Sequence, residues 1–313
     1  MHFSKPRREF LKMAGLSALA GAGAQLLGSP VPQAAIADAD AAIGKAARLL
    51  SGCCAYSYGQ DLKRGAMTLE DFICKAAELR LDGVDMTAYY LKSTEPEYLD
   101  GLRQLAYKNA MPLSGSACGV SMVQGSRAQR ADSLNEIKKW VDVTDRLGAS
   151  HLRIFAGKLA PGNTLQEAIG WVVETMKAGC DYSGQKGITL GLEDHAGVSQ
   201  NAEVCLEIMH RVNSPYAAIN LDITNFIPTT AQDAYAQIAA CIPYASNTHI
   251  RDRFSDQTPV DLDRIWRLFA AAGFRGYMSA EYEPSRANNE VAATGVLKLI
   301  AKIQALCRRY SGT

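Results

Sequence analysis

Two patterns of apolar and polar positions take turns along most of the chain, a short apolar run and then a longer amphipathic one. In TLEDFICKAAELRL the apolar residues Leu69, Phe72, Ile73, Ala76 and Leu79 recur at helical spacing. The runs LNEIKKWVDVTDRLGA and LDRIWRLFAAAGF predict further helices. The short apolar runs predict eight strands, at 48–58, 83–89, 112–119, 151–157, 188–194, 217–223, 245–252 and 277–283.

This alternation predicts an α/β fold with a parallel sheet, because each crossover between parallel strands needs a connecting helix. Eight strand–helix units over roughly 260 residues match a single (β/α)8 TIM barrel, whose usual length is about 250 residues. The competing fold is an open doubly wound sheet, which normally has a glycine-rich phosphate turn after its first strand. The segment SGCCAYSYGQD is not such a turn, so the barrel is the better prediction.

The N-terminus has the layout of a signal peptide. KPRREFLKMAGLSALAGAGAQLLG is basic and then mildly apolar, and the small residues AIA at 35–37 provide a cleavage site. Arg7 and Arg8, with the following Phe-Leu-Lys at 10–12, resemble the twin-arginine export motif. We therefore predict a signal peptide over 1–37, a linker over 38–46 and the barrel domain over 47–313. An ordinary amphipathic helix is the alternative for the leader.

That interpretation implies export by the twin-arginine machinery, a periplasmic or exported location and no permanent membrane span, since the apolar stretch is weak. Composition fits a globular domain, with 48% hydrophobic and 21% charged residues. The net charge is +1 and basic residues are mixed with acidic ones, so the sequence shows no basic segment of the kind that nucleic-acid binding requires. The sequence leaves the oligomeric state open. Eight cysteines without a CxxC pair read as free core thiols, at positions 53, 54, 74, 118, 180, 205, 241 and 307.

Candidate chemistry lies at the ends of the last four predicted strands. Glu193, Asp222, His249 and Glu281 follow one another at separations of 29, 27 and 32 residues (193 to 222, 222 to 249, 249 to 281), about one strand–helix unit each. Neighbouring strands lie about 4.8 Å apart, and the C-terminal strand ends of such barrels carry the active site. We therefore expect the four side chains to converge.

Three carboxylates buried together would repel one another and take up protons unless a cation neutralised them. Three oxygen ligands and one nitrogen suit Mn²⁺ best, with Mg²⁺, Co²⁺ and Fe²⁺ as alternatives, and suit a tetrahedral zinc site less. Taken singly, a strand-end glutamate is usually solvated and a histidine is usually an ordinary core residue. Four such residues at equivalent positions on consecutive predicted strands favour a metal site.

These residues resemble the xylose isomerase-like (β/α)8 superfamily of sugar isomerases and epimerases, over essentially everything after residue 45. Members similar to ketose 3-epimerases, hydroxypyruvate isomerases and inosose dehydratases bind one divalent metal through Glu, Asp, His and Glu on strands five to eight. GLEDHAGVSQNAE resembles the Glu-Asn-His-Gly turn of the family, with Asp194 in the Asn place and Gly197 shifted by one. MTLEDFICKAAELRLDGVDM resembles its first helix and second strand.

The resemblance implies that Glu193 and Glu281 are catalytic as well as metal ligands. Carboxylates beside a metal-bound substrate can remove the proton next to a carbonyl and so give a cis-enediolate. Return of the proton on the other face, or at the adjacent carbon, gives an epimer or an isomer. If the enediolate instead expels a neighbouring hydroxyl group or glycosidic oxygen, the enzyme is a lyase or dehydratase, for example on a 3-keto-glycoside or an inosose. The residues do not decide between these outcomes.

Five residues are candidates for substrate binding: His195, Arg251, Asn225, Arg153 and Tyr56. His195 would face the cavity if its strand reached that far, whereas Asp194 should point away and hold the turn. Arg153 is equally compatible with a buried ion pair, and Tyr56 with ordinary packing.

Two positions depart from the epimerase-like pattern, which puts free-ketose epimerase activity in doubt. Asn225 stands where those members have a histidine, and Ser255 where they have an arginine; Arg251 and Arg253 are the nearest substitutes.

Two other functions compete. The AP endonuclease branch of the fold needs a multi-metal cluster rich in histidine, but only four histidines follow the leader, and the neutral charge suits DNA poorly. A non-catalytic periplasmic sugar-binding barrel is the other alternative. Because phosphorylated intermediates are rare outside the cytoplasm, export favours a non-phosphorylated sugar, keto-sugar, glycoside or cyclitol as the small-molecule partner.

Overall fold

The protein, as a computed structural model that describes residues 47–228, 233–284 and 292–311, is a closed barrel of eight parallel strands. The strands pair in chain order, and β8 pairs with β1 to close the barrel. They are β1 (Arg48–Cys54), β2 (Gly83–Thr87), β3 (Leu113–Ser121), β4 (His151–Phe155), β5 (Thr189–Glu193), β6 (Ala217–Asp222), β7 (Ala245–Ile250) and β8 (Arg275–Ala280). The predicted (β/α)8 fold is confirmed.

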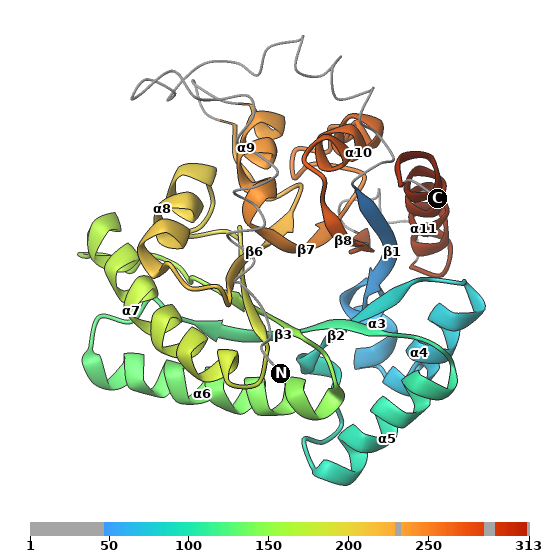
Figure 1. Cartoon of the computed structure of the whole chain (residues 1–313), viewed down its shortest axis with the longest axis horizontal. Coiled ribbons are helices and arrows are strands. Elements are labelled where there is room, and N and C mark those ends of the chain that lie inside the picture. The colour runs from blue at the N-terminus through green and yellow to red at the C-terminus, as the bar shows by residue number, and fades with distance from the viewer. Residues whose placement is uncertain (1–46, 229–232, 285–291, 312–313) are drawn as a thin grey trace, which may run out of the picture.

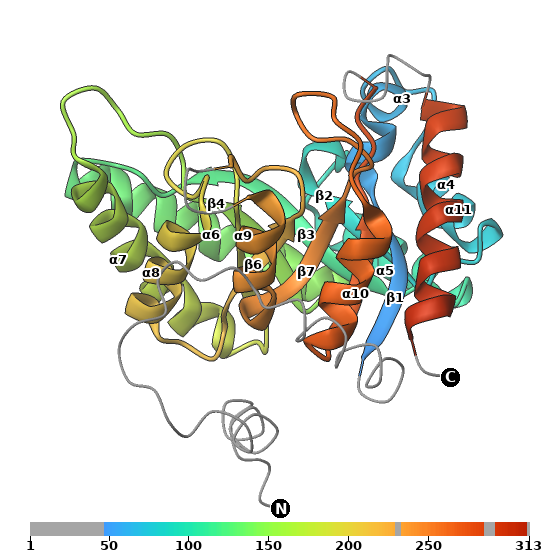
Figure 2. The same cartoon turned by 90° about the horizontal axis from the view of Figure 1, so that it is seen from above.

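Helices surround the strands in chain order, from α4 and α5 past α6, α7, α8 and α9 to α10 and α11 (Figure 1). Seen from above in Figure 2, α11 lies beside β1, so the last helix covers the seam where the barrel closes. The helices are α3 (Gly59–Lys63), α4 (Leu69–Glu78), α5 (Pro96–Lys108), α6 (Arg127–Leu147), α7 (Leu165–Gly184), α8 (Ala202–Val212), α9 (Ala234–Cys241), α10 (Leu262–Ala271) and α11 (Ala292–Tyr310). Short 3-10 helices are η1 (Ala55–Tyr58), η2 (Ala88–Tyr90) and η3 (Ile242–Tyr244).

Local sequence signals fix several of these boundaries. Thr68 and Asp71 form a capping box that starts α4, and Thr164 and Glu167 start α7 in the same way. Gly148 adopts the left-handed conformation, with φ of 79°, and ends α6, where glycine is the residue that takes this conformation without strain.

Some predicted strands were too long. The first, predicted over 48–58, ends at Cys54, and the second, predicted over 83–89, ends at Thr87, because the chain turns into η1 and η2 there. The eighth begins at Arg275 and ends at Ala280, so Glu281 is the first residue after β8.

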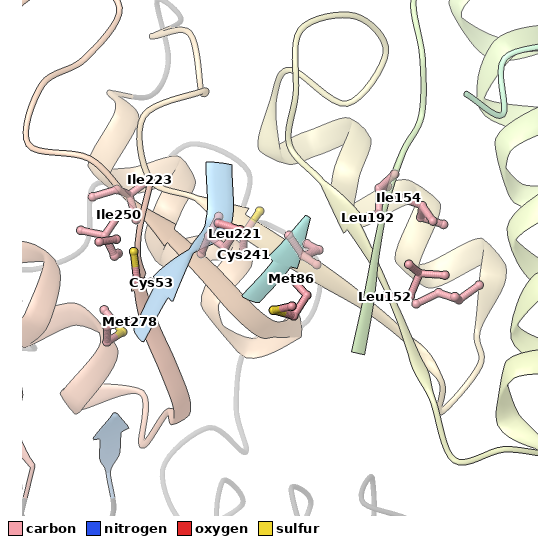
Figure 3. Close-up of a cluster of buried hydrophobic side chains, with 14 of the residues drawn as sticks. Cys53, Met86, Leu152, Ile154, Leu192, Leu221, Ile223, Cys241, Ile250 and Met278 are labelled. Atoms are coloured by element: carbon pink, nitrogen blue, oxygen red, sulfur yellow. The ribbon is translucent and has the colours of Figure 1, made fainter. Parts of the chain in front are cut away.

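The apolar core lies mainly between the strands and the surrounding helices. Alternate residues of a barrel strand face inward and outward, and the outward set is apolar: Leu152 and Ile154 on β4, Leu192 on β5 and Leu221 on β6 are fully buried (Figure 3). Trp266 on α10 belongs to the same core.

The inward positions of β4 to β8 are mostly polar, where a barrel of this kind usually packs Val, Ile and Leu. Buried polar side chains at those positions are His151, Arg153, Glu193, Asn220, Asp222, Asn247, His249 and Ser279. Polar side chains, and not an apolar core, therefore fill this part of the barrel interior.

All eight cysteines are free thiols, and seven are buried. Among the described residues, no helix combines the length and the apolarity that a membrane span requires. The predicted signal peptide and linker, residues 1–46, lie outside the described residues.

Candidate metal centre

The four predicted strand-end residues lie together inside one end of the barrel. Glu193 and Asp222 are the last residues of β5 and β6, His249 is the penultimate residue of β7, and Glu281 directly follows β8. Asp222 pairs with His249 in the sheet, which brings those two strand ends level. All four side chains are buried.

His249 stands at the centre of the group. Its Nδ1 lies 2.8 Å from Glu281 Oε2 and 3.4 Å from Glu193 Oε2. One ligand atom each from Glu193, Asp222 and His249 lie within 4.8 Å of one another, close enough to hold a single metal ion. The donor set of carboxylates and one imidazole suits a divalent cation of the Mn²⁺ or Mg²⁺ kind.

A buried oxygen of the cluster lacks a hydrogen-bond partner, which is a second reason to expect a cation. Glu281 Oε2 makes ion pairs but no hydrogen bond of acceptable geometry with any described residue, although it is shielded from water. Buried polar atoms are almost always satisfied, so this oxygen has room for a further partner such as a metal ion. The residues present thus fit a metal.

Two buried arginines balance the carboxylates. The Arg153 Nε atom lies 3.1 Å from Glu193 Oε2. Arg251 Nη1 pairs closely with Asp222 Oδ2, and its Nη2 lies 3.1 Å from Glu281 Oε2. The alternative interpretation of Arg153 as a buried ion pair is therefore correct, and the ion pair lies within the site itself.

These contacts shift the ionisation of the cluster. Burial by itself would raise the pKa of Glu193, but Arg153 and His249 outweigh it and lower that pKa. For Glu281, Arg251 and His249 outweigh burial in the same way, and the pKa falls well below its ordinary value. Both glutamates are thus held as carboxylates. Burial would lower the pKa of His249, but Glu281 and Asp85 contribute to raising it well above its ordinary value.

A chain of amides lies beneath the carboxylates. Asn220 Nδ2 donates to Glu193 Oε2 at 3.3 Å, and Asn247 Nδ2 donates both to Asn220 Oδ1 at 3.1 Å and to Asp85 Oδ2 at 2.9 Å. Asp85 lies on β2, across the barrel, and is fully buried. The amides therefore tie the Glu193 carboxylate to a fixed polar floor.

Asp194 has a structural role different from the expected one. It points away from the cavity, as predicted, and lies fully buried near Cys205 of α8 and Cys241 of α9; its Oδ1 accepts a hydrogen bond from the Asp222 backbone N–H at 2.7 Å, so it joins a neighbouring strand where its own turn was expected. Burial, and then the nearby Asp222 carboxylate, raise the pKa of Asp194 well above its ordinary value. A neutral carboxyl thus joins the ends of β5 and β6.

The predicted substrate-binding residues lie at different depths. β5 ends at Glu193, so His195 is not on the strand; its ring instead packs on Phe155 with centroids 4.6 Å apart. Phe155 in turn lies under the Arg153 guanidinium at 4.0 Å, which places His195 on the Arg153 side of the site. Arg251 is inside the site, as described above.

The remaining predicted positions lie further out. Asn225 and Tyr56 are half-buried, and Asn225 Nδ2 has no hydrogen-bond partner among the described residues. Arg253 donates to the Gln257 backbone carbonyl in a surface loop, and Ser255 is exposed. Of the two substitute arginines, Arg251 alone contacts the carboxylates.

Sequence reasoning missed Asp85, Asn220 and Asn247. A signal for two of them was present, because Asn220 precedes Asp222 by two residues and Asn247 precedes His249 by two, so each pair shares one face of its strand. Asp85 is likewise a lone charge in the apolar run GVDMTAY.

The comparison with protein-family models identifies the fold family. The model of the xylose isomerase-like TIM barrel matches residues 73–302, most of the chain. The chain belongs to this family. No curated protein sequence matches it.

Solved structures of xylose isomerase-like barrels share the fold. D-psicose 3-epimerase with D-tagatose from Clostridium cellulolyticum H10 is 13% identical, with a TM-score of 0.68 over 84% of this chain and 100% of that one. The probable 3-DHS dehydratase AsbF from Bacillus anthracis is 14% identical, with a TM-score of 0.64 over 82% and 98%. The IolI protein with a bound zinc atom is 16% identical, with a TM-score of 0.65 over 85% and 100%. At such identities the likeness establishes the fold alone.

Proposed function

We propose that this protein is a divalent-metal-dependent sugar isomerase or epimerase that removes a proton next to a substrate carbonyl. The observation that carries the proposal is the buried group of Glu193, Asp222, His249 and Glu281 at the C-terminal ends of four consecutive strands. Two glutamates lie within 3.4 Å of the His249 Nδ1 atom, so two carboxylates are available for proton transfer at one centre.

Glu193, Asp222, His249 and Glu281 would hold the metal. Mn²⁺ is the proposed ion, with Mg²⁺, Co²⁺ and Fe²⁺ as alternatives. A divalent cation in such a site acts as a Lewis acid toward a carbonyl oxygen and makes the adjacent C–H more acidic.

Glu193 and Glu281 move the proton. Arginine and histidine side chains beside Glu193 and Glu281 lower the pKa of both carboxyl groups. Each is therefore ionised near neutral pH and can accept a proton. One carboxylate takes the proton from the carbon beside the carbonyl and leaves an enediolate. The other returns a proton to the opposite face for epimerisation, or to the neighbouring carbon for isomerisation.

The residues around the glutamates define where substrate binds. Arg153 pairs with Glu193 and Arg251 pairs with Glu281, so both guanidinium groups lie beside the carboxylates. His195 packs on Phe155 beside Arg153, whereas Tyr56 and Asn225 lie nearer the surface. Hydroxyl groups of a sugar or cyclitol suit such a lining of N–H donors and aromatic rings.

The substrate class also depends on the proposed location. If residues 1–37 direct twin-arginine export, the protein works in the periplasm or outside the cell, where phosphorylated sugars are rare. We therefore propose a non-phosphorylated sugar, keto-sugar or cyclitol.

A lyase or dehydratase reaction is the second candidate, on a 3-keto-glycoside or an inosose. It is favoured by Asn225 and the exposed Ser255 at positions where epimerase-like members have a histidine and an arginine. The same carboxylates would remove the same proton. The enediolate would then expel the hydroxyl group or glycosidic oxygen substituent at the next carbon.

Solvent deuterium exchange tests these reactions together. The protein is incubated with Mn²⁺ in D₂O with free ketoses, keto-glycosides and inososes, and the C–H next to the carbonyl is followed by proton NMR. Isomerase or epimerase activity replaces that hydrogen with deuterium and gives a new sugar, whereas lyase activity gives an unsaturated ketone.

The variants Glu193→Gln and Glu281→Gln should lose the exchange, and Glu207→Gln on the surface of α8 should keep it. Binding of these sugars without any exchange would contradict catalysis and leave a sugar-binding barrel.

A further inference from the structure

His249 is held between acceptor groups on both sides of its ring. Nδ1 faces Glu281 Oε2 at 2.8 Å and Glu193 Oε2 at 3.4 Å. On the other side, Nε2 faces Asp85 Oδ2 at 3.4 Å. The ring is fully buried, so water does not compete for either nitrogen.

Asp85 belongs to a different part of the barrel from the four strand-end residues. It lies in the middle of β2, pairs with Cys54 on β1 and Gly115 on β3, and is itself fully buried. Its Oδ2 is fixed by Asn247 Nδ2 at 2.9 Å, whereas its Oδ1 has no hydrogen-bond partner among the described residues. This carboxylate is therefore held rigidly with one oxygen toward His249.

We propose that Asp85 is a positioning residue that fixes the His249 ring with its Nε2–H toward Asp85 and its Nδ1 lone pair toward the carboxylates. This inference rests on the proposed metal function. Asp85 can only accept a hydrogen bond from Nε2, whereas Nδ1, besides facing the two glutamates, faces the amide donor Asn220 Nδ2 at 3.4 Å. A neutral imidazole has one N–H, so Nδ1 is left free to bind a cation between Glu193, Asp222 and Glu281.

A competing arrangement uses the same atoms differently. Cys54, Asp85 and His249 also present ligand atoms within 4.8 Å of one another, on the opposite side of the ring. The Cys54 Sγ lies 3.4 Å from Thr87 Oγ1, with which it shares a hydrogen bond. Cys54 and Asp85 thus already have partners in Thr87 and Asn247, and two glutamates face the Nδ1 side of the ring. The geometry therefore favours Asp85 as the hydrogen-bond acceptor of His249 over a metal in this second group.

Metal affinity tests the proposal without any need for activity. Mn²⁺ is titrated calorimetrically into the metal-stripped protein and into the variants Asp85→Asn, Asp85→Ala and Asp82→Asn. Removing the partner of a metal-binding histidine typically weakens metal affinity by about 10- to 100-fold. We expect a loss of Mn²⁺ affinity near the upper end of this range for Asp85→Ala. The loss should be near the lower end for Asp85→Asn, which keeps one acceptor oxygen. Asp82→Asn is the control, because Asp82 bonds Ser51 at the other end of the barrel.

The tautomer is measured directly by ¹⁵N–¹H NMR of the Zn²⁺-loaded protein with labelled histidine, and His249→Ala assigns the signal. The proposal predicts a proton on Nε2 and the metal on Nδ1. Metal on Nε2 would overturn it in favour of the Cys54 group. Variants at Asp85 that bind Mn²⁺ as the wild type does would also overturn it, even if Asp85→Ala failed to fold and only Asp85→Asn were compared. A wild-type protein that binds no metal would instead refute the proposed function.

Discussion

The Asp194 carboxyl accepts a hydrogen bond from the backbone N–H of Asp222 at 2.7 Å, and it does so while fully buried. Burial, and then the Asp222 carboxylate, raise the pKa of Asp194, so the group is neutral in the folded protein. A buried neutral carboxyl therefore holds the end of β6 in place and adds no further negative charge beside Glu193 and Asp222.

Asp194→Asn should stabilise the protein at neutral and alkaline pH. The unfolded chain loses the Asp194 proton above about pH 4, whereas the folded protein keeps it, so rising pH favours unfolding of the wild type. Asparagine keeps the acceptor oxygen and does not titrate. The gain should be about 1.4 kcal/mol for each unit by which folding raises the pKa.

Urea unfolding at pH 4.5 and pH 8 checks this, and the advantage of the variant should grow with pH. An equal effect of pH on the two proteins would show that Asp194 is ionised in the folded state.

Much of this arrangement could be predicted from sequence because strand geometry is regular. The spacing of Glu193, Asp222, His249 and Glu281 by one strand–helix unit each is a direct consequence of the barrel, and the structure places the four side chains together. Asp85 could not be placed in the same way, since it comes from β2 and reaches His249 across the barrel. Such contacts depend on barrel closure and side-chain length, which spacing along the chain does not reveal.

Local chain geometry also limited the prediction for single residues. His195 was expected near the cavity through strand alternation, but β5 ends two residues earlier, and the ring is placed by Phe155 instead. Asp194 was expected to hold its own turn, whereas its side chain accepts a hydrogen bond from the backbone N–H of Asp222 and so joins the ends of β5 and β6. Both outcomes depend on where a strand ends, which is the least regular feature of an element.

Arg251→Met should destabilise the metal-free protein and make it depend on metal. Arg251 pairs with Asp222 and Glu281, and loss of one partner from a buried ion pair typically costs about 3–5 kcal/mol. A divalent ion would neutralise the same carboxylates. Thermal unfolding with EDTA and with Mn²⁺ should therefore show a larger Mn²⁺-induced rise in Tm for this variant than for the wild type.

Arg253→Met is the matched control for that experiment, since the Arg253 guanidinium donates to the Gln257 backbone carbonyl in a surface loop and pairs with none of the buried carboxylates. If Mn²⁺ raises the Tm of Arg251→Met by no more than that of the wild type, the arginine and the metal do not neutralise the same charges.

His151→Gln should remove part of the acid sensitivity of folding. Burial lowers the pKa of His151 to about 4, and neither ring nitrogen has a hydrogen-bond partner among the described residues. Between about pH 6.5 and 4 the unfolded chain takes up a proton that the folded protein does not, so wild-type stability falls by about 3 kcal/mol as pH decreases.

Chemical denaturation at pH 7 and pH 4.5 should show a smaller acid-induced loss for His151→Gln. His210→Gln, at an exposed position on α8, should keep the wild-type loss. The same loss in His151→Gln would assign the acid sensitivity to other groups.

Arg153→Met should shift the pH dependence of catalysis. Arg153 lowers the pKa of Glu193, because the adjacent guanidinium favours the charged carboxylate. Without it, Glu193 needs a higher pH to act as base, so the acidic limb of kcat/KM should move to higher pH.

Tyr89→Phe serves as the control for that profile, because it removes only a 3.4 Å hydrogen bond from Arg153 and leaves the ion pair with Glu193. An acidic limb that stays in place in Arg153→Met would mean that Glu193 is not the base.

The proposal that four strand ends hold one divalent ion is tested most directly by the metal stoichiometry of the purified protein. Calorimetric titration of the metal-stripped protein with Mn²⁺ should give about one ion per chain. Binding should be strongly weakened in His249→Ala and Glu281→Gln and unchanged in Glu207→Gln. No binding by the wild type, or equal binding by His249→Ala, would contradict a metal centre formed by Glu193, Asp222, His249 and Glu281.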